Sequence, residues 1–370
     1  MTKAAELAKM GEVLTNGQIG GRRNIVINGA MQVAQRGTSS TGNTSGGYKT
    51  VDRFKFDLTN LGTHTFAQST DAPTGFKTAL RVDCTTADAS PAAGDLLYCI
   101  TGLEGQDLQQ LKKGTSDAEK FTISFYVKSN KTGTYVVEIF DADNTRHIAN
   151  TYTISSANTW EQKTITFIGD TSGAFGNDNG GSMYLLWWIG GGTTYTSGST
   201  PTSWASVSNA NRAAGLNVNI ADNTANDWAI TGVQLEVGSQ ATPFEHRSFG
   251  EELQLCRRYL QYFDAHSNYD RFAIGTATTT DDCNFLFKFN PYMRDVPTLV
   301  HGTLSEIAVL DNDNSAEAIG SLSIDTNTDG PQGCNVEASD ITSDVMTAGD
   351  ATQISANNTA NAFISFDSEL

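Results

Sequence analysis

Hydrophobic and polar residues alternate with a period of two over most of residues 24–237, as they do in β-strands that bury one face. In the stretch FTISFYVKS, Phe121, Ile123, Phe125 and Val127 fall on one face of such a strand. The NKTG that follows indicates a hairpin leading into TYVVEIFDA. Many strands without helices between them favour an antiparallel β-sandwich over this part of the chain.

The alternation slips once, within DWAITGVQLEV. Ile230 occupies an even position, whereas Val233 and Leu235 occupy odd positions. One extra residue in a strand moves all later side chains to the other face, so an insertion at Thr231–Gly232 restores the alternation. The sequence therefore predicts a β-bulge at that point.

Two short segments have a helical period instead, and the first lies at the N-terminus. Residues 2–14 place Leu7, Met10 and Leu14 on one stripe, and a glycine-rich stretch then ends the helix. A helix this short is marginal by itself, so it is expected to pack against something else. We assign the helix and its linker to residues 1–23.

The second helical segment follows the sandwich and is expected over residues 249–265. Ser248 and Glu251 have the spacing of a capping box, which marks a helix start. Four apolar residues then recur at steps of three and four, namely Leu253, Cys256, Leu260 and Phe263. This stripe fits a helix that lies on its own sandwich, and it equally fits a seam between identical helices at an oligomer axis.

Residues 266–370 return to the strand pattern. RFAIGTATTTDDCNFLFKFN is typical of a hairpin, and NAFISFDSEL is typical of a terminal strand. We therefore expect a mainly β protein, with a sandwich over 24–248, a linking helix over 249–265 and a smaller β-domain over 266–370.

Composition narrows the range of functions. The formal net charge is −17 at pH 7, and an acidic surface repels the phosphate backbone, so nucleic-acid binding is not expected. No run of apolar residues is long enough to cross a bilayer, so membrane insertion is not expected either. The five cysteines are widely spaced without a CxxC pair, and we expect them to be reduced thiols.

Catalytic motifs are not recognisable in the sequence. Carboxylates are frequent enough to supply the pair that glycoside hydrolysis needs, but none lies in a known hydrolase motif. The five histidines are far apart, and no G-x-S-x-G motif occurs. We therefore expect neither an enzyme nor a cofactor.

Aromatic residues cluster in WWIGGGTTYTSGSTPTSW and make the best candidate for a ligand site. They are Trp187, Trp188, Tyr195 and Trp204. Adjacent tryptophans on a strand point to opposite faces, so one of the pair is expected in the core. The other, with Tyr195 and Trp204, would form an apolar platform for sugar rings; alternatively, these rings pack a subunit interface or anchor a loop.

Three blocks of the sequence resemble tail-fibre and receptor-binding proteins of bacteriophages, especially marine and cyanobacterial podoviruses. The blocks are RRNIVINGAMQVAQRGTS, GYKTVDRF and DWAITGVQLEVGSQATPFEHRSFGEELQLCRRYLQYF. Their order matches over residues 22–263. The resemblance implies a homotrimeric virion tail fibre, assembled in the host cytoplasm, whose central module is a jelly roll similar to carbohydrate-binding modules.

The same resemblance implies partners for the chain. Leu7, Met10 and Leu14 of the N-terminal helix would anchor it to other virion proteins, the stripe of the second helix would lie at a trimer axis, and a host-surface glycan would be the receptor. A capsid-bound head fibre or decoration protein would share every block, and a polysaccharide-degrading tailspike is a further alternative. Jelly-roll modules often hold a structural calcium ion, whose ligands this sequence does not identify.

Overall fold

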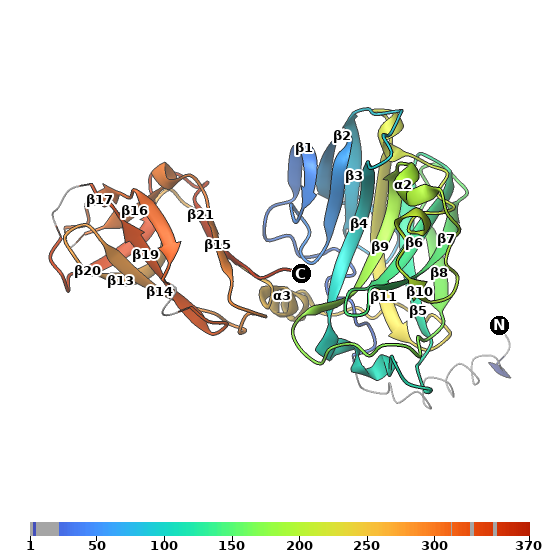
Figure 1. Cartoon of the computed structure of the whole chain (residues 1–370). Helices are drawn as coiled ribbons and strands as arrows, with labels where there is room; N and C mark the ends of the chain where they lie inside the picture. Colours follow the sequence, from blue (N-terminus) through green and yellow to red (C-terminus); the bar gives the residue numbers. More distant parts are fainter. Residues whose placement is uncertain (1–2, 5–21, 312, 326–328, 343–345) are drawn as a thin grey trace. The chain divides into compact units, whose positions relative to one another are not determined.

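The protein forms two compact units in its computed structural model, shown in Figure 1. The first comprises residues 1–252 with Leu370, and the second comprises residues 253–369. The structure describes residues 3–4, 22–311, 313–325, 329–342 and 346–370. The predicted N-terminal helix, with the anchor residues Leu7, Met10 and Leu14, lies outside the described residues.

Antiparallel strands β1 to β11 build the first unit (Figure 1). They are β1 Ser39–Gly47, β2 Lys55–Ser69, β3 Ala79–Thr86, β4 Leu96–Glu104, β5 Phe121–Ser129, β6 Gly133–Asp141, β7 Arg146–Ile154, β8 Glu161–Phe167, β9 Gly181–Gly191, β10 Ala205–Ser206 and β11 Asp227–Val237. The short helices between them are η1 Gly105–Leu111, α2 Thr193–Thr196, η2 Asn209–Asn211 and η3 Ile220–Asp222. No described helix is long and apolar enough to cross a membrane.

The long strand β2 divides the strands into two layers. Its residues 55–59 pair with β4, and its residues 63–69 pair with β3. Gly62, between the two halves, has a φ of +74°, a conformation that favours glycine. The first layer, sheet I, runs β10-β7-β6-β9-β4-β2, and the second, sheet II, runs β2-β3-β11-β5-β8.

The order of these strands is that of a jelly roll. Strands β4-β9-β6-β7 form one sheet and β3-β11-β5-β8 the other, so the chain crosses repeatedly from one layer to the next. The inner faces meet in one hydrophobic core, in which Phe125 of β5 packs edge-on against Trp187 of β9 at 5.8 Å between ring centroids. Phe121, Ile123 and Val127 lie in the same core, as predicted. The predicted mainly β jelly-roll sandwich is confirmed.

The predicted β-bulge is also present. Thr231 of β11 pairs with Tyr126 of β5, but the next pair joins Gln234 to Ser124, so β11 contains one extra residue. Gly232 has a φ of +63°, and a Cβ atom there would lie 2.7 Å from the ring of Phe76. The bulge thus falls where an aromatic ring covers the backbone closely enough to require glycine.

The second unit has its own two sheets and its own core. A three-stranded sheet runs β12-β21-β15, and a seven-stranded sheet runs β17-β16-β20-β13-β14-β19-β18. The strands are β12 Leu260–Asp264, β13 Arg271–Ala277, β14 Cys283–Lys288, β15 Thr298–His301, β16 Ile307–Leu310, β17 Ala316–Ala318, β18 Ser321–Ile324, β19 Gly333–Ser339, β20 Ala351–Ala356 and β21 Phe363–Asp367, with the short helix η4 at Leu304–Glu306. Phe366 of β21 lies at the centre of the core, within 4.9 Å of the rings of Phe287 and Phe289.

The predicted linking helix is shorter than expected. Helix α3 spans Phe249–Arg257 and begins with the predicted capping box, in which the Ser248 amide donates to Glu251 Oε2 at 2.9 Å. The chain then forms β12, which pairs with β21. The prediction of helix over 249–265 is therefore wrong in its second half.

The predicted helical seam fails for the same reason. Leu253 and Cys256 lie on α3, whereas Leu260 and Phe263 lie on β12, so the four residues do not form one helical stripe. Cys256 and Leu260 are buried within the chain itself. Phe263 packs against the Phe287 ring at 5.5 Å. These side chains serve the packing of a single chain.

All five cysteines are buried and none forms a disulfide in the structure, in agreement with the prediction of reduced thiols. Burial raises the pKa of the Cys334 thiol to about 12 and also raises the pKa of Cys84 and Cys283. The thiolate is the reactive form of cysteine, so these side chains are chemically inert packing groups.

Candidate functional site

The outer face of sheet I points away from the sandwich core and carries charged, polar and aromatic side chains side by side. Because side chains alternate along a strand, the neighbours of core residues on β2, β4, β6, β7 and β9 all project there. The face comprises Lys55, Asp57, Tyr98, Ile100, Val136, Glu138, Phe140, His147, Ala149, Tyr184, Leu186 and Trp188. Asp57, Tyr98 and Trp188 lie side by side in register across three strands.

A buried carboxylate, Glu138, organises the part of this face over β6, β7 and β9. Its two oxygens accept hydrogen bonds from Trp188 Nε1 at 2.9 Å and from Arg212 Nε at 3.0 and 3.1 Å. His147 Nδ1 lies 2.9 Å from Oε1. Glu138 and His147 are fully buried, and a charge without water is tolerated only with such partners.

Arg212 reaches Glu138 from a segment that folds over the sheet, residues 192–216. This covering segment contains α2 and η2, and its β10 pairs with the edge of β7 (Figure 1). Its Tyr195 ring lies 5.2 Å from the Trp188 ring, and the Arg212 guanidinium lies 5.3 Å from the same ring. Burial alone would lower the pKa of Arg212, but the Glu138 charge raises it, so the guanidinium stays charged.

The other end of the outer face, over β2 and β4, contains a hollow of about 430 Å³. We call it the Tyr98 pocket. Its lining is Gly46, Gly47, Tyr48, Lys55, Asp57, Leu58, Thr59, Leu96 and Tyr98. Lys55 and Asp57 belong to β2 and Tyr98 to β4, so an ammonium, a carboxylate and a phenol are held on two paired strands.

The phenol of Tyr98 is held in its protonated form. Burial, followed by the charge of Asp57, raises the pKa of Tyr98 well above its ordinary value. Its ring packs on Trp188 at 4.5 Å between centroids, which fixes its orientation. The pocket therefore offers a fixed phenol beside groups of both charges.

The predicted sugar platform is not formed. Trp187 and Trp188 do point to opposite faces as predicted, but both are fully buried, one in the sandwich core and one beneath the covering segment. Trp204 lies elsewhere, where its Nε1 donates to the Ile168 carbonyl at 2.8 Å. Of the four predicted residues, only Tyr195 and Trp188 are in contact, and the prediction of an exposed platform is wrong.

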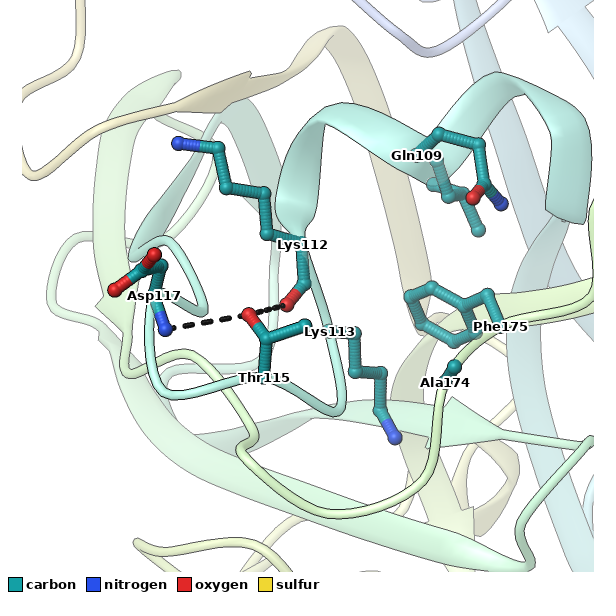
Figure 2. A pocket seen from close by; sticks show the side chains of 8 residues that line it. Gln109, Lys112, Lys113, Thr115, Asp117, Ala174 and Phe175 are labelled. Carbon is teal, nitrogen blue, oxygen red and sulfur yellow. Dashed lines mark hydrogen bonds between the residues drawn. The ribbon is translucent and has the colours of Figure 1, made fainter.

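A second hollow of the first unit, about 390 Å³ in volume, lies beside Phe175 (Figure 2). Its polar groups are engaged within the protein. Gln109 donates to the carbonyls of Gly105 and Gly176 at 2.8 Å, and Lys112 pairs with Glu119 at 2.7 Å. In the Tyr98 pocket the Tyr48 hydroxyl and Lys55 Nζ likewise donate to the Leu370 carbonyl, at 2.7 and 3.5 Å, so engagement of polar groups does not distinguish the two pockets.

No group of three or more His, Cys, Asp and Glu residues in the described part of the chain is placed to hold a metal ion. Oxygen atoms of Asp141, Asp170, Ser172 and Gly173 surround the ammonium group of Lys113. Figure 2 shows the Lys113 side chain beside the Phe175 pocket.

Comparison with known proteins shows distant structural likeness alone. No protein-family model and no curated protein matches the chain. The enzymatically active domain of tailspike protein 4 from bacteriophage CBA120 is similar over 58% of this chain, at 12% identity and a TM-score of 0.30. The chain spans about a fifth of that structure, 21% of its length.

Two smaller structures are matched over almost their whole length. A putative sugar binding protein from Bacteroides thetaiotaomicron is 11% identical over 58% of this chain and 100% of its own, with a TM-score of 0.31. A xylan-binding domain of carbohydrate-binding module family 22 is 13% identical over 56% of this chain and 98% of its own, with a TM-score of 0.29. Likeness this distant carries no argument about function.

Proposed function

We propose that the chain is a subunit of a bacteriophage tail fibre that recognises a host-surface glycan in the Tyr98 pocket. The observation that carries the site is the placement of Lys55, Asp57 and Tyr98 around one hollow on paired strands. Sugar hydroxyls need both donors and acceptors, and because the Tyr98 ring is buried the proposal rests on these polar groups rather than on ring stacking. The fibre assignment is supported by the three sequence blocks over residues 22–263.

We further propose that the glycan is bound without being cleaved. Glycoside hydrolysis ordinarily uses two carboxyl groups on either side of the scissile bond. Asp57 is the single carboxylate among the residues that line the pocket, and Glu138 is fully buried and occupied by its hydrogen bonds. This arrangement supports a recognition site.

The test compares two aspartates on two pockets. Asp57→Ala removes the carboxylate of the Tyr98 pocket, and Asp117→Ala removes an exposed carboxylate of the Phe175 pocket (Figure 2). On an array of bacterial surface polysaccharides, we expect Asp57→Ala to weaken binding by about tenfold or more, since a hydrogen bond to a charged group contributes about 1.5–3 kcal/mol. Asp117→Ala is expected to leave binding unchanged.

Three outcomes would contradict this assignment. Equal binding by Asp57→Ala and the unaltered chain would place the glycan elsewhere. If the unaltered chain bound none of the polysaccharides, the recognition role would be wrong. If it released new reducing ends from them, the proposal that the glycan is not cleaved would be wrong.

We also propose that the chain assembles as a homotrimer and that its N-terminal segment, residues 1–23, docks on other virion proteins. The resemblance to phage fibres supports both parts of this proposal. The residues Leu253, Cys256, Leu260 and Phe263 do not support a trimer axis. Sedimentation of the purified chain is expected to give the mass of a trimer. A stable monomer at micromolar concentration would refute this part of the proposal.

A further inference from the structure

The Lys113 ammonium lies in a cage of oxygen atoms. Asp141 Oδ2 is 2.6 Å from Nζ and Asp170 Oδ2 is 3.1 Å away. Nζ also donates to the carbonyls of Ser172 and Gly173 at 2.9 and 2.7 Å. Two carboxylates and two carbonyls make up the donor set that hard cations such as Ca²⁺ prefer.

The cage is buried and closed by aromatic rings. The side chains of Lys113, Asp141 and Asp170 are each exposed by 3% or less. The rings of Phe175 and Trp204 lie 5.1 and 5.5 Å from Nζ, and Figure 2 shows the Lys113 side chain extending beside Phe175. Aromatic faces attract a cation, so these two rings and the four oxygen atoms favour positive charge at this position.

Further hydrogen bonds hold the two carboxylates in place without Lys113. Asn144 donates its backbone and side-chain amides to Asp141, and Arg146 donates to both oxygens of Asp170 at 2.7 and 3.0 Å. Burial alone would raise the pKa of Asp170, but the hydrogen bonds from Arg146, the Ser172 amide and Lys113 outweigh it and lower the pKa. The two carboxylates are therefore held in position by neighbours that would remain if Lys113 were removed.

The cage joins segments that are separate in the sequence. Lys113 follows η1, Asp141 ends β6, and the remaining oxygens belong to the loop 170–173 after β8. With Lys113 and Arg146 against Asp141 and Asp170, the four formal charges cancel. Removal of Lys113 leaves a net charge of −1 in a buried site, which is unfavourable. A bound Ca²⁺ would change this net charge to +1, with the charge of Arg146 partly exposed to water.

We propose that this cage is a built cation site which the chain fills with the Lys113 ammonium, and that loss of the lysine side chain converts it into a Ca²⁺ site. The distances to Nζ need to shorten only slightly to reach the Ca–O range of about 2.3–2.6 Å, and water can complete the shell. Mg²⁺ demands shorter bonds of about 2.0–2.1 Å and stricter geometry, so it fits less well. In the unaltered chain the ammonium makes the sandwich independent of calcium.

The test is thermal unfolding of the full chain in excess CaCl₂ and in EDTA. Lys113→Ala in EDTA is expected to lower the midpoint of the first unit by about 10 °C, because a buried ion-pair network loses its cation. Saturating Ca²⁺ is expected to raise that midpoint by about 5 °C or more, and MgCl₂ by less. The neighbouring Lys112→Ala is the control, since Lys112 is exposed, and its midpoint should respond to Ca²⁺ as little as that of the unaltered chain.

Terbium provides a direct readout of the site. Tb³⁺ takes the oxygen ligands of Ca²⁺, and at the position of Nζ it would lie 5.5 Å from the Trp204 ring, close enough for indole excitation to sensitise its emission. We expect sensitised emission that Ca²⁺ competes away in Lys113→Ala and that is absent from the Lys113→Ala/Asp141→Asn double variant, whose cage has lost one carboxylate charge.

The outcomes are decisive even if the variant folds poorly. Recovery of folded Lys113→Ala in Ca²⁺ but not in EDTA supports the proposal as strongly as a raised midpoint. A midpoint that Ca²⁺ leaves unchanged, failure to fold in both solutions, or equal rescue of the double variant would each overturn it. None of these results depends on whether the chain binds a glycan.

Discussion

Replacing Glu138 with alanine is expected to lower the free energy of unfolding of the first unit by about 3–5 kcal/mol. The substitution leaves the Arg212 guanidinium, whose side chain is exposed by only 17%, without its carboxylate, and it leaves the buried Trp188 N–H without an acceptor. Both groups lose the partner that compensates for their removal from water. All five tryptophans of the chain lie in the first unit, so tryptophan fluorescence during urea unfolding reports on this unit alone.

Two further variants show whether the effect comes from the buried network around Glu138 or from the loss of a carboxylate in general. Glu138→Gln retains one acceptor oxygen and the shape of the side chain, so it should cost less than Glu138→Ala. Glu119→Ala removes a carboxylate from the exposed pair with Lys112, and exposed ion pairs contribute little. If Glu138→Ala proved as mild as Glu119→Ala, the covering segment would not depend on the buried network.

The parts of the fold that the sequence predicted correctly are those in which the apolar side chains of a strand share one face. Phe121, Ile123, Phe125 and Val127 alternate without interruption because this side of β5 meets the hydrophobic core, whereas the other side buries polar residues such as Thr122 and Ser124. The bulge at Thr231–Gly232 was predictable for the same reason, since a slip of one residue moves every later side chain to the other face.

The second half of the linking helix could not be read in this way. Leu260 and Phe263 continue the helical spacing of Leu253 and Cys256, but a short apolar run fits more than one period. The outcome was decided by β21, about a hundred residues later, whose backbone pairs with residues 260–264. Pairing between strands so far apart in the sequence is not visible in the local pattern of hydrophobic residues.

The candidate site was missed for a related reason. Glu138 occupies an outward position of TYVVEIF, where a charged residue ordinarily meets solvent. Its burial depends on the covering segment, which brings Arg212 back over the sheet from 74 residues along the chain. Asp57 and Tyr98 are likewise ordinary outward residues of two strands until β2 and β4 pair. The alternation revealed that Trp187 and Trp188 face opposite ways, but not that both faces are covered.

Trp187 lies in the core of the sandwich, and its truncation is expected to destabilise the first unit strongly. Trp187→Ala should lower the free energy of unfolding of the first unit by about 3–5 kcal/mol, because the ring is fully buried between Phe54, which precedes β2, and Phe125 of sheet II. Fluorescence remains usable, since four tryptophans are left in the unit. The truncation leaves a cavity that the paired strands on both sides cannot collapse to fill.

The same variant distinguishes a core residue from a sugar platform. If Trp187 packs the sandwich, the folded fraction of Trp187→Ala should bind surface polysaccharide as the unaltered chain does, while its unfolding midpoint in urea falls. A stacking residue would give the reverse, with normal stability and lost binding. Trp204→Ala is the matched comparison, because that ring is only partly buried and donates one hydrogen bond to Ile168, so its loss should cost less stability. A Trp187→Ala protein that unfolds at the unaltered midpoint would show that the two layers do not meet at this ring.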